Sequence, residues 1–388
     1  MHILVYGVPI FYGMAGSKRI QNHLKYFFKT NNILISNLFE IDEYPCKEFP
    51  QNILLKVIIN KNNGVFKILR SIFKQFVCIY GWKTKDNKNI FYVYGYPDIK
   101  NIFIILFAKI LGYQIIFDIV EDRYYTKLYK NTMSKFRIKT SIFFIKYIYL
   151  LSNFCIVITD HLNNKIKEIT RNKIYIYKIP VSVDLDYFDE VKNKSIQPVI
   201  DNRITKIFYG GSFGEKDGLF YLIEAVQKLS IKGYKLSLTM SGKGAKRNEE
   251  KVLSYIRKSD LDGIINYVSY LEDMEYVQYL WNSDVFCVTR TKSDFANAGF
   301  PFKVGEYLAT GRPLIVSNVS EVSNYLVDKE SAILIKPNSA VEIITALEFV
   351  INNKGKALKI GEKGRKVAEK YFNASKISQE LYEKLTSL

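Results

Sequence analysis

Short apolar runs alternate along this chain with longer stretches in which apolar residues recur every three or four positions. The short runs are typical of buried strands and the longer stretches of amphipathic helices. Strand and helix in regular succession predict a parallel sheet with helices on both faces. In the first half we predict strands at residues 3–6, 33–39, 91–94, 115–118, 155–159 and 173–179, and helices at 17–29, 99–111 and 161–170.

The alternation stops at residues 180–203 and then restarts. This interval is polar and contains Asp184, Asp186, Asp189 and Glu190, so we interpret it as a linker between domains. In the second half we predict strands at 204–209, 236–240, 265–268, 285–288, 314–316 and 332–335, and helices at 219–229, 245–259, 274–281, 341–351 and within 356–386.

The length of 388 residues exceeds one ordinary hydrophobic core, so two domains are expected. We predict an α/β protein of two doubly wound, Rossmann-like domains that face each other across a cleft. The first domain covers residues 1–190 and the second 191–375. Residues 376–388 form a C-terminal helix that is expected to pack back on the first domain. Ligands of such sheets bind beyond the carboxyl ends of the strands.

Two apolar stretches, residues 102–120 and 142–158, have nearly the length of a membrane span. Lys109 and Asp118 interrupt the first and Lys146 interrupts the second. Each therefore predicts a buried helix followed by a buried strand. The N-terminus begins with a short strand and a glycine turn rather than a signal peptide.

The segment 297–316 carries the clearest chemical signal. Gly299 and Pro301 predict a turn, residues 302–310 suit a short helix, and Gly311 is a typical residue to end it. A helix that begins after such a turn presents backbone N–H groups and a partial positive charge.

Two charged side chains complete this segment. Lys303 adds a positive charge in the first turn, and Glu306 lies three residues on, on the same side of the helix. A cationic pocket beside a carboxylate suits a nucleoside diphosphate, because the lysine and N–H groups can bind phosphates and the carboxylate can bind ribose hydroxyls. A Gly/Pro loop that only joins packed elements is the alternative.

The same segment resembles the signature of family 4 of the GT-B glycosyltransferases, which use nucleotide sugars and retain anomeric configuration. Two glutamates separated by seven residues define that signature. Glu306 matches the second, which the resemblance implies binds the ribose, whereas Ala298 occupies the first position, which contacts the donor sugar. The chain is similar to members with a Gly-Phe-Pro-x-Lys-x-x-Glu-Tyr variant, which in this sequence comprises Gly299, Phe300, Pro301, Lys303, Glu306 and Tyr307. The resemblance implies a GT-B fold.

Residues 209–218 form a glycine-rich loop between a predicted strand and a predicted helix. Its glycines, Gly211 among them, permit close approach of the backbone to a phosphate. The resemblance implies a donor-phosphate loop, although the family's arginine and lysine positions fall on Ser212 and Asp217. Lys216 is displaced by one residue, so we expect Lys216 or Lys303 to supply the phosphate charge. A plain tight turn is the alternative.

Two further loops follow predicted strands of the second half. Residues 241–244 resemble the family's glycine turn beside the nucleotide, with Gly242 as a donor-binding residue. The spacing excludes a P-loop. The resemblance also implies that backbone groups near Tyr270 and Leu271 contact the base. A strand-to-helix turn and aromatic packing explain the same residues without a ligand.

Three residues of the first half are candidates for the acceptor side. The resemblance implies that a glycine loop at residues 13–19 borders the acceptor, and Gly16 is the best single position. Asp118 ends a buried strand where the family has His or Asp beside the reacting centre, so Asp118 is a candidate catalytic residue. Glu121 follows it and could orient an acceptor hydroxyl. A helix cap with an acidic first turn is the alternative.

The formal net charge of +18 is concentrated in the first half. Residues 51–150 hold 17 Lys and Arg but only 5 Asp and Glu. Within residues 66–76 and 123–149 the basic residues are interspersed with aromatic and aliphatic ones. Basic amphipathic helices bind anionic membrane surfaces, so we expect peripheral association with such a surface. A core-facing stripe with a solvated basic face is the alternative.

Metal and cysteine chemistry are not indicated by the sequence. The three histidines, His2, His23 and His161, have no partner ligand at metal spacing. Cys155 and Cys287 lie in apolar, strand-like runs, which predicts reduced core thiols and a reducing compartment. The resemblance agrees, because GT-B enzymes need no catalytic metal, and we expect no cofactor.

These observations predict a retaining, metal-independent glycosyltransferase of the hexosyltransferase type. It would transfer a sugar from a nucleoside-diphosphate sugar to a lipid-linked or oligosaccharide acceptor, in bacterial capsule or lipopolysaccharide synthesis. We expect it in the cytoplasm, on the inner face of the cytoplasmic membrane.

Three alternatives remain at this stage. A nucleotide-sugar epimerase or phosphorylase would need further acid/base groups or a cofactor lysine. A homologue that binds nucleotide sugar without transferring it is suggested by Ala298 and Ser212. A nucleic-acid-binding protein would explain the charge, but no recognised module for nucleic acid is present.

Overall fold

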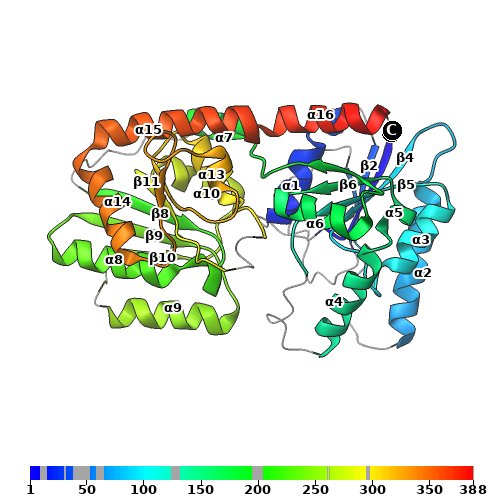
Figure 1. Ribbon diagram of the computed structural model, residues 1–388, viewed down its shortest axis with the longest axis horizontal. Coiled ribbons are helices and arrows are strands. Elements are labelled where there is room, and N and C mark those ends of the chain that lie inside the picture. The colour runs from blue at the N-terminus through cyan, green and yellow to red at the C-terminus, as the bar shows by residue number, and fades with distance from the viewer. Residues whose placement is uncertain are drawn as a thin grey trace. The chain divides into compact units, whose positions relative to one another are not determined.

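The computed structural model divides the chain into two compact units (Figure 1). The first comprises residues 1–180 and 375–388, and the second residues 181–374. The structure describes residues 1–8, 15–29, 32–37, 53–57, 65–123, 132–194, 204–259, 261, 263–293 and 298–387. Among the segments singled out above, residues 13–14, 38–39, 124–131, 195–203, 294–297 and 388 lie outside the described residues.

In the described residues, the first unit has a seven-stranded parallel sheet in the order β3-β2-β1-β4-β5-β6-β7. Its strands are β1 (His2–Tyr6), β2 (Asn32–Asn37), β3 (Ile53–Val57), β4 (Asn89–Tyr94), β5 (Gln114–Ile119), β6 (Phe154–Val157) and β7 (Tyr175–Lys178). The helices are α1 (Ala15–Leu24), α2 (Val65–Trp82), α3 (Ile102–Ile110), α4 (Thr132–Ile145), α5 (Ile148–Leu151), α6 (Asp160–Thr170) and α16 (Ala374–Ser387).

The second unit has a six-stranded parallel sheet, again counted over the described residues, in the order β10-β9-β8-β11-β12-β13. Its strands are β8 (Thr205–Gly210), β9 (Leu236–Ser241), β10 (Ile265–Val268), β11 (Val285–Val288), β12 (Leu314–Ser317) and β13 (Ile333–Ile335). The helices are α7 (Leu185–Lys194), α8 (Leu219–Ile231), α9 (Lys246–Lys258), α10 (Asp273–Trp281), α12 (Lys303–Ala309), α13 (Val322–Tyr325), α14 (Ala340–Asn352) and α15 (Lys354–Val367).

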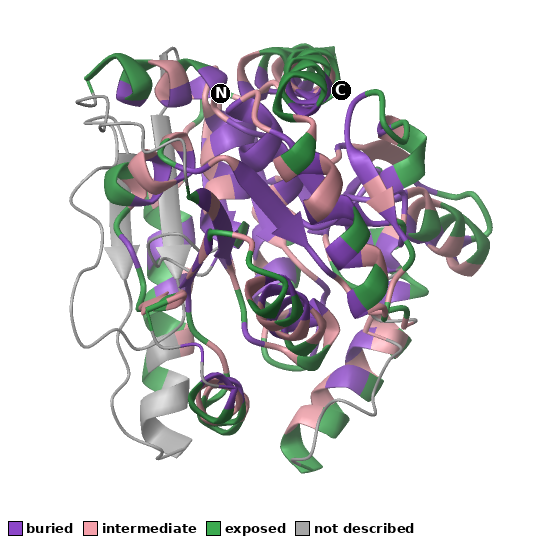
Figure 2. Ribbon diagram, turned by 90° about the vertical axis from the view of Figure 1, so that its left-hand side faces the viewer, coloured by how far each residue is buried: buried purple, intermediate pink, exposed green. Residues whose placement is uncertain are grey.

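The central strands of both sheets are buried beneath helices, and Figure 2 colours buried strands purple. In the first unit Ile3, Ile90 and Ile116 belong to one apolar core that also includes Leu381 of α16. In the second unit the strands share a core with α8 and α14. Strands covered on both faces read as continuous apolar runs, which explains why the alternation was visible in the sequence. The predicted α/β class with two parallel sheets is confirmed.

The division between the units lies ten residues before the predicted boundary at 190. Residues 185–194 form α7 rather than a linker, and this helix packs within the second unit. The Trp281 indole N–H donates a hydrogen bond to the Phe188 carbonyl (3.0 Å), and Arg365 forms a salt bridge with Asp189 (2.7 Å). Of the acidic residues that suggested a linker, Asp186, Asp189 and Glu190 lie on the outer side of this helix, and Asp184 precedes it and accepts a hydrogen bond from the Tyr187 N–H (3.1 Å).

Residues 375–388 at the C-terminus belong to the first unit. The Tyr26 backbone N–H donates to the Ser378 hydroxyl (2.8 Å), which in turn donates to the His23 carbonyl (2.7 Å). Tyr382 packs edge-to-face on Phe27 (5.1 Å between ring centroids). The chain therefore crosses from the second unit to complete the core of the first.

Two elements differ from the prediction in the first half. The strand β3 lies in a stretch where none was expected, and α1 ends at Leu24 before a separate 3₁₀ turn at Phe27–Lys29. No helix among the described residues is both long enough and apolar enough to cross a membrane.

Substitution of Leu381 tests the contribution of α16 to the first unit. Leu381 is fully buried, so Leu381→Ala should lower the free energy of unfolding of this unit by about 2–5 kcal/mol through lost burial and a residual cavity. Urea denaturation monitored by circular dichroism measures the change. The matched control is Glu383→Ala at an exposed position of the same helix. Equal stability of the two variants would contradict the assignment.

Candidate functional site

The loops after β8 and β9 meet at the carboxyl edge of the second sheet. Gly211 and Gly242 have φ angles of +143° and +131°, which are unfavourable for other residues. The Gly211 N–H donates to the Ser241 carbonyl (2.9 Å), and a Cβ added to Gly242 would overlap the Gly211 carbonyl. The two predicted donor-binding glycines therefore lie side by side, and the contact between the loops leaves no room for a side chain at Gly242.

Lys303 lies against the first of these loops. Its ammonium stands 3.9 Å from the centroid of the Tyr209 ring and 3.9 Å from Asp217 Oδ1, and its side chain is only 13% exposed. A Cβ added to Gly211 would lie 2.7 Å from Lys303 Nζ, too close for van der Waals contact. The structure thus brings together Lys303 and Gly211, which are 92 positions apart in the sequence.

Burial lowers the pKa of Lys303 to about 8, and the negative charge of Asp217 limits the decrease. The neighbouring cations Arg290 and Lys216 lower this pKa further, while Glu306 raises it. Lys303 is still mainly protonated at pH 7. It is therefore a desolvated positive charge, which attracts an anion more strongly than a solvated lysine does.

Asp217 organises the loop beside Lys303. Its Oδ2 accepts hydrogen bonds from the Ser212 hydroxyl (2.7 Å) and the Gly214 N–H (3.1 Å), and its backbone carbonyl accepts one from Thr289 Oγ1 (3.0 Å). Where the family resemblance implied two cations, this chain has an exposed serine, Ser212, hydrogen-bonded to a buried carboxylate, Asp217. The positive charge comes from elsewhere in the unit.

Arg290 is one source of that charge, and the sequence analysis missed it. It lies two residues after β11, and its Nη1 donates to the Gly299 carbonyl (3.0 Å), so it holds the loop that leads into α12. Burial lowers the pKa of Arg290, while Asp217 raises it. A basic residue directly after an apolar strand was the available signal. The half-buried Lys216 is a third cation near Lys303.

Glu306 is buried on α12, 6% exposed. Its Oε2 accepts a hydrogen bond from the Tyr276 hydroxyl (3.1 Å). The next residue, Tyr307, donates to the Gly210 carbonyl (3.3 Å), accepts from the Gly210 N–H (2.7 Å) and stacks on Phe286 (4.4 Å). Glu306 is thereby held close to the end of β8 and its glycine loop.

The turn before α12 differs from the prediction in one respect. The helix has only seven residues, and the N–H groups of Val304 and Gly305 donate to the Pro301 and Phe302 carbonyls (3.1 and 3.2 Å). These two amides are not available to a ligand. The Lys303 ammonium, rather than the start of the helix, therefore dominates the positive charge of this region.

The remaining predicted donor residues have mixed environments. Phe300 is 5% exposed and packs against Tyr325 and Phe372, so it contributes to the core of the second unit. Pro301 is buried and Gly299 half-buried. After β10, Tyr270 is 41% exposed, whereas Leu271 is buried.

In the first unit Asp118 is fully buried in an ion pair with Arg19. The Arg19 guanidinium donates to both Asp118 oxygens (2.9–3.2 Å), and the Tyr92 hydroxyl donates to Oδ2 (2.8 Å). Arg19 also donates to the carbonyls of Ile179 and Pro180. A carboxylate enclosed in this way joins α1, β4, β5 and the segment after β7. We therefore interpret Asp118 as structural rather than catalytic.

The other acceptor-side candidates lie near that edge. Gly16 is buried in the first turn of α1, and Glu121 is exposed two residues after β5. The neighbouring Asp122 is buried and accepts hydrogen bonds from His161 Nε2 (2.9 Å) and Lys165 Nζ (2.6 Å) of α6.

Among the described residues, no group of three or more His, Cys, Asp or Glu side chains could hold a metal ion. Cys78, Cys155 and Cys287 are buried free thiols, and burial raises the pKa of Cys155 well above its ordinary value and that of Cys287 to about 12. The prediction that Cys155 and Cys287 are core thiols is confirmed. Cys46 lies outside the described residues.

The second unit has recognisable relatives. Residues 191–367 match the family model described as glycosyl transferases group 1. The chain is 28% identical over 181 residues to an uncharacterized glycosyltransferase of Haemophilus influenzae, covering 46% of this chain and 48% of the relative. It is 24% identical over 177 residues to the capsular polysaccharide biosynthesis glycosyltransferase CapM of Staphylococcus aureus, covering 45% and 44%. The chain thus spans about half the length of the curated relatives it matches. Part of this chain is thus similar to group 1 glycosyltransferases.

Solved structures resemble the whole chain. Sucrose-phosphate synthase from Thermosynechococcus elongatus matches with a TM-score of 0.76 at 14% identity, covering 100% of this chain and 99% of that one. HepE of Anabaena, solved in complex with UDP, matches with a TM-score of 0.74 at 14% identity and covers both chains fully. At this identity the likeness shows the fold, which is the GT-B fold.

The buried charge of Lys303 predicts a pH-dependent difference in stability. The folded-state pKa of about 8 lies below the ordinary 10.5, so the folded state loses its proton first and the burial penalty decreases as the pH rises from about 8 towards 10.5. Wild type should gain about 1–3 kcal/mol of stability relative to Lys303→Met between pH 7 and pH 9.5. Denaturant titrations at several pH values measure this. Parallel curves of unfolding free energy against pH for wild type and Lys303→Met would contradict this prediction. The control is Lys243→Met, which replaces an exposed lysine.

Proposed function

We propose that this chain is a retaining glycosyltransferase of family 4 that uses a nucleoside-diphosphate sugar. The observation that carries the proposal is the set of groups around Asp217. Lys303 and Arg290 lie on one side of a glycine loop whose backbone reaches the carboxyl edge of the sheet, and Glu306 lies on the same helix as Lys303. Such a set suits a diphosphate joined to a ribose.

The relatives and structural neighbours support the same reading. Two of the relatives bear the name glycosyltransferase, one of them for capsular polysaccharide. HepE was solved with UDP and with UDP-glucose. We propose a nucleotide-sugar donor for this chain and a role in bacterial surface polysaccharide synthesis.

The charge distribution suggests how the sugar would be released. As the bond from the anomeric carbon to the diphosphate oxygen breaks, negative charge grows on the leaving diphosphate. Lys303, Arg290 and Lys216 would stabilise that charge without the help of a metal, since they are held in place before the reaction. The acceptor hydroxyl forms the new bond to the anomeric carbon on the same face and gives its proton to the leaving diphosphate. Glu306 would bind the ribose hydroxyls.

The residues proposed to bind the acceptor differ from those predicted from the sequence. Asp118 is occupied by Arg19, so Glu121, exposed at the carboxyl edge of the first sheet, is the better candidate to orient an acceptor hydroxyl. Gly16 would leave room for the ligand nearby. A lipid-linked or oligosaccharide acceptor is proposed, and the charge of the first unit favours the lipid-linked one.

Exposed apolar residues on α2 and α3 support peripheral binding to an anionic membrane. The two helices contact each other through Phe76 and Phe107 (4.4 Å between ring centroids). Their outer faces carry Phe73 (65% exposed), Tyr80 (69%) and Ile110 (82%). The exposed basic residues Arg70, Lys74 and Lys109 lie among them. Apolar side chains with neighbouring basic ones suit the inner face of the cytoplasmic membrane.

A transfer assay tests the proposed donor site. The full chain should release nucleoside diphosphate from one of a panel of UDP-, GDP- and ADP-sugars, with EDTA present, when a lipid-linked acceptor is supplied. Lys303→Met should reduce kcat/KM by about 100-fold or more, because it removes a charge aimed at the leaving group. Glu306→Gln should raise the Kd for the matching nucleotide about tenfold.

The control for this assay is Glu272→Gln at an exposed position of the same unit. Nucleotide binding without turnover of any sugar would favour a binding homologue over a transferase. The absence of both binding and turnover would overturn the proposal, and binding of nucleic acid in its place would favour the basic-protein alternative.

Sedimentation with vesicles tests the membrane proposal. Wild type should sediment with vesicles that contain about 30% phosphatidylglycerol and not with pure phosphatidylcholine vesicles, and binding should weaken as salt rises because charge is screened. The double variant Phe73→Ser/Ile110→Ser should lose most of this binding with its fold intact. Phe220→Ser, at an exposed aromatic residue of the second unit, is the control. Retained binding by the double variant would contradict the assigned face.

A further inference from the structure

A second cluster of polar side chains lies in the first unit, where the order of the sheet reverses. The chain places β2 and β3 on one side of β1, and β4 through β7 on the other. Ligands of doubly wound sheets bind beyond the carboxyl ends of the strands at this point. Tyr6 ends β1, Asp98 follows β4 and Arg123 follows β5. These residues therefore meet at one edge, and none of them belongs to the donor site described above.

Two arginines share a single buried carboxylate in this cluster. Asp98 is 1% exposed, and its Oδ2 accepts hydrogen bonds from Arg137 Nη2 (2.6 Å) and Nε (3.1 Å) and from Arg123 Nη1 (3.4 Å). Its Oδ1 accepts from the Lys100 N–H (2.8 Å). The single negative charge of Asp98 is thus paired with two guanidinium groups, so the cluster carries a net charge of one positive unit. The guanidinium side chains are 24% and 29% exposed, so solvent reaches them.

The Arg123 side chain is held in one orientation. Its Nη1 also donates to the Ser141 hydroxyl of α4 (3.1 Å), and the guanidinium lies over the Tyr96 ring, 5.5 Å from the centroid. A Cβ added to Gly95 would lie 3.9 Å from Arg123 Nη2, so the guanidinium lies close to the turn that ends β4. No described residue accepts a hydrogen bond from its Nε or Nη2. A preoriented guanidinium with donors to spare suits a phosphate.

Tyr6 provides an independent sign of a ligand. The residue is 2% exposed, and among the described residues its hydroxyl has no hydrogen-bond partner. Tyr6 pairs with Val93 near the end of β4, and its hydroxyl lies within electrostatic range of Asp98 and Arg137. A buried hydroxyl without a partner is unfavourable, and phenylalanine would fill the same space without that cost. A ligand oxygen at this position would supply the missing partner.

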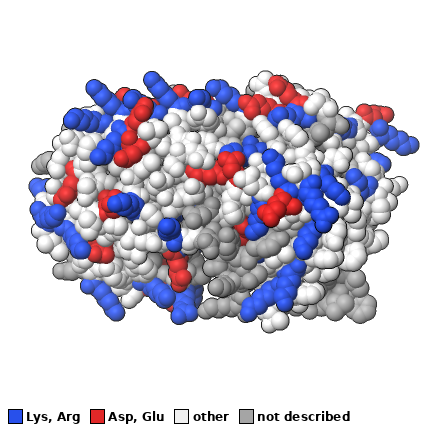
Figure 3. Space-filling model, viewed as in Figure 1, with Lys and Arg blue, Asp and Glu red and all other residues white. Residues whose placement is uncertain are grey.

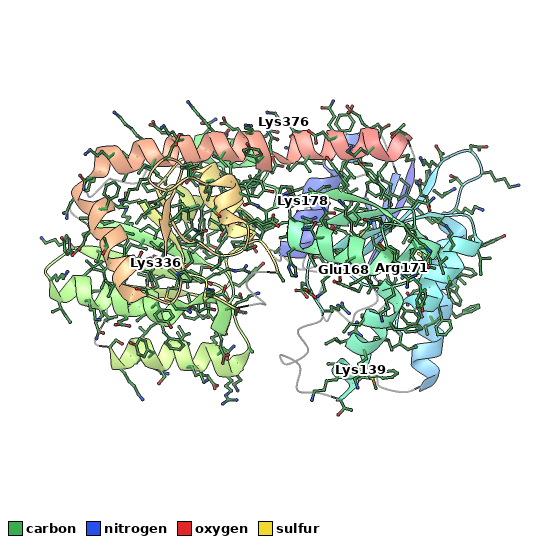
Figure 4. The ribbon with its side chains drawn as sticks, viewed as in Figure 1. Lys139, Glu168, Arg171, Lys178, Lys336 and Lys376 are labelled. Atoms are coloured by element: carbon green, nitrogen blue, oxygen red, sulfur yellow. The ribbon has the colours of Figure 1, made fainter. Side chains whose placement is uncertain are left out.

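The surroundings of the pair indicate an amphiphilic ligand. Met133 and Phe136, one turn and one residue before Arg137 on α4, are 61% and 52% exposed. Basic side chains gather over α4 on the face seen in Figure 3. Lys139, labelled in Figure 4, points outward from this helix and takes no part in the cluster around Asp98. Exposed apolar side chains thus lie on the same helix as Arg137.

We propose that Arg123, Arg137 and Tyr6 bind a phosphate group of an amphiphilic acceptor. The two guanidinium groups would pair with the phosphate oxygens, and the Tyr6 hydroxyl would donate to one of them. The exposed apolar residues of α4 would contact the hydrocarbon part. The acceptor role rests on the proposed function, whereas phosphate binding at this cluster does not.

Calorimetric titration of the full chain tests the site with three probes. Dodecyl phosphate below its micelle concentration carries both phosphate and tail, inorganic phosphate carries no tail, and dodecyl maltoside carries no phosphate. Wild type should bind dodecyl phosphate and not dodecyl maltoside. If inorganic phosphate binds as well, the phosphate group alone is sufficient for binding, and a free phosphorylated compound can occupy the site. If inorganic phosphate does not bind, the site requires a phosphate that is attached to a lipid. Both results support a phosphate site.

The variants separate a binding role from a structural one. Arg137→Gln and Arg123→Gln should each weaken dodecyl phosphate binding at least about tenfold, and Lys139→Gln, with the same charge change on the same helix, by less than about twofold. Tyr6→Phe should weaken binding about tenfold while Tm stays equal or rises, because it removes only an unpaired hydroxyl. That outcome is inconsistent with a purely structural tyrosine.

The result that would overturn the inference is the absence of dodecyl phosphate binding by wild type, or equal binding by wild type and Tyr6→Phe. UDP is titrated into the same samples, since its proposed site lies in the second unit. Loss of UDP binding with intact phosphate binding would count against the proposed donor site alone. Intact UDP binding without phosphate binding would count against this inference alone.

Discussion

The second unit is organised around a positive charge that is largely removed from water. Lys303 stands against the Tyr209 ring and at 3.9 Å from Asp217, close enough to Gly211 that any side chain there would collide with it. Removing an ammonium from water is unfavourable unless other charges compensate. Asp217 compensates in part and is itself fixed by Ser212 and Gly214. A bound diphosphate would complete the compensation, which explains why stability and proposed activity depend on the same lysine.

The first unit contains two carboxylate–arginine clusters of different character. Asp118 and Arg19 are 0% and 2% exposed, and their hydrogen bonds join them to other buried groups. Asp98 is as deeply buried, but its two arginines are about a quarter exposed, and Arg123 Nε and Nη2 have no acceptor among the described residues. A closed ion pair orients the elements that it joins, whereas an open one can still exchange water for a ligand. Accessibility, rather than residue type, separates the structural cluster from the candidate binding site.

Much of the architecture could be predicted from the sequence because strands covered on both faces are continuously apolar. The strands β4, β5, β8 and β11 were placed within two residues by this pattern. The helix α7 was mistaken for a linker, since its acidic face resembles a loop when its partners Trp281 and Arg365 are not known. The short strand β3 was missed because its surroundings lack a clear alternation.

The sequence by itself determined the fold class and which residues of the segment around residue 300 are capable of binding a nucleotide, because turn, helix and charge signals act locally. Only the tertiary structure decided how these residues are used. It brought Arg290 within electrostatic range of Lys303, engaged two amides in the first turn of α12, and enclosed Asp118 with Arg19. It also assembled Tyr6, Asp98, Arg123 and Arg137 from three strand ends and a helix. Burial and long-range pairing depend on how distant segments pack, and no local pattern encodes them.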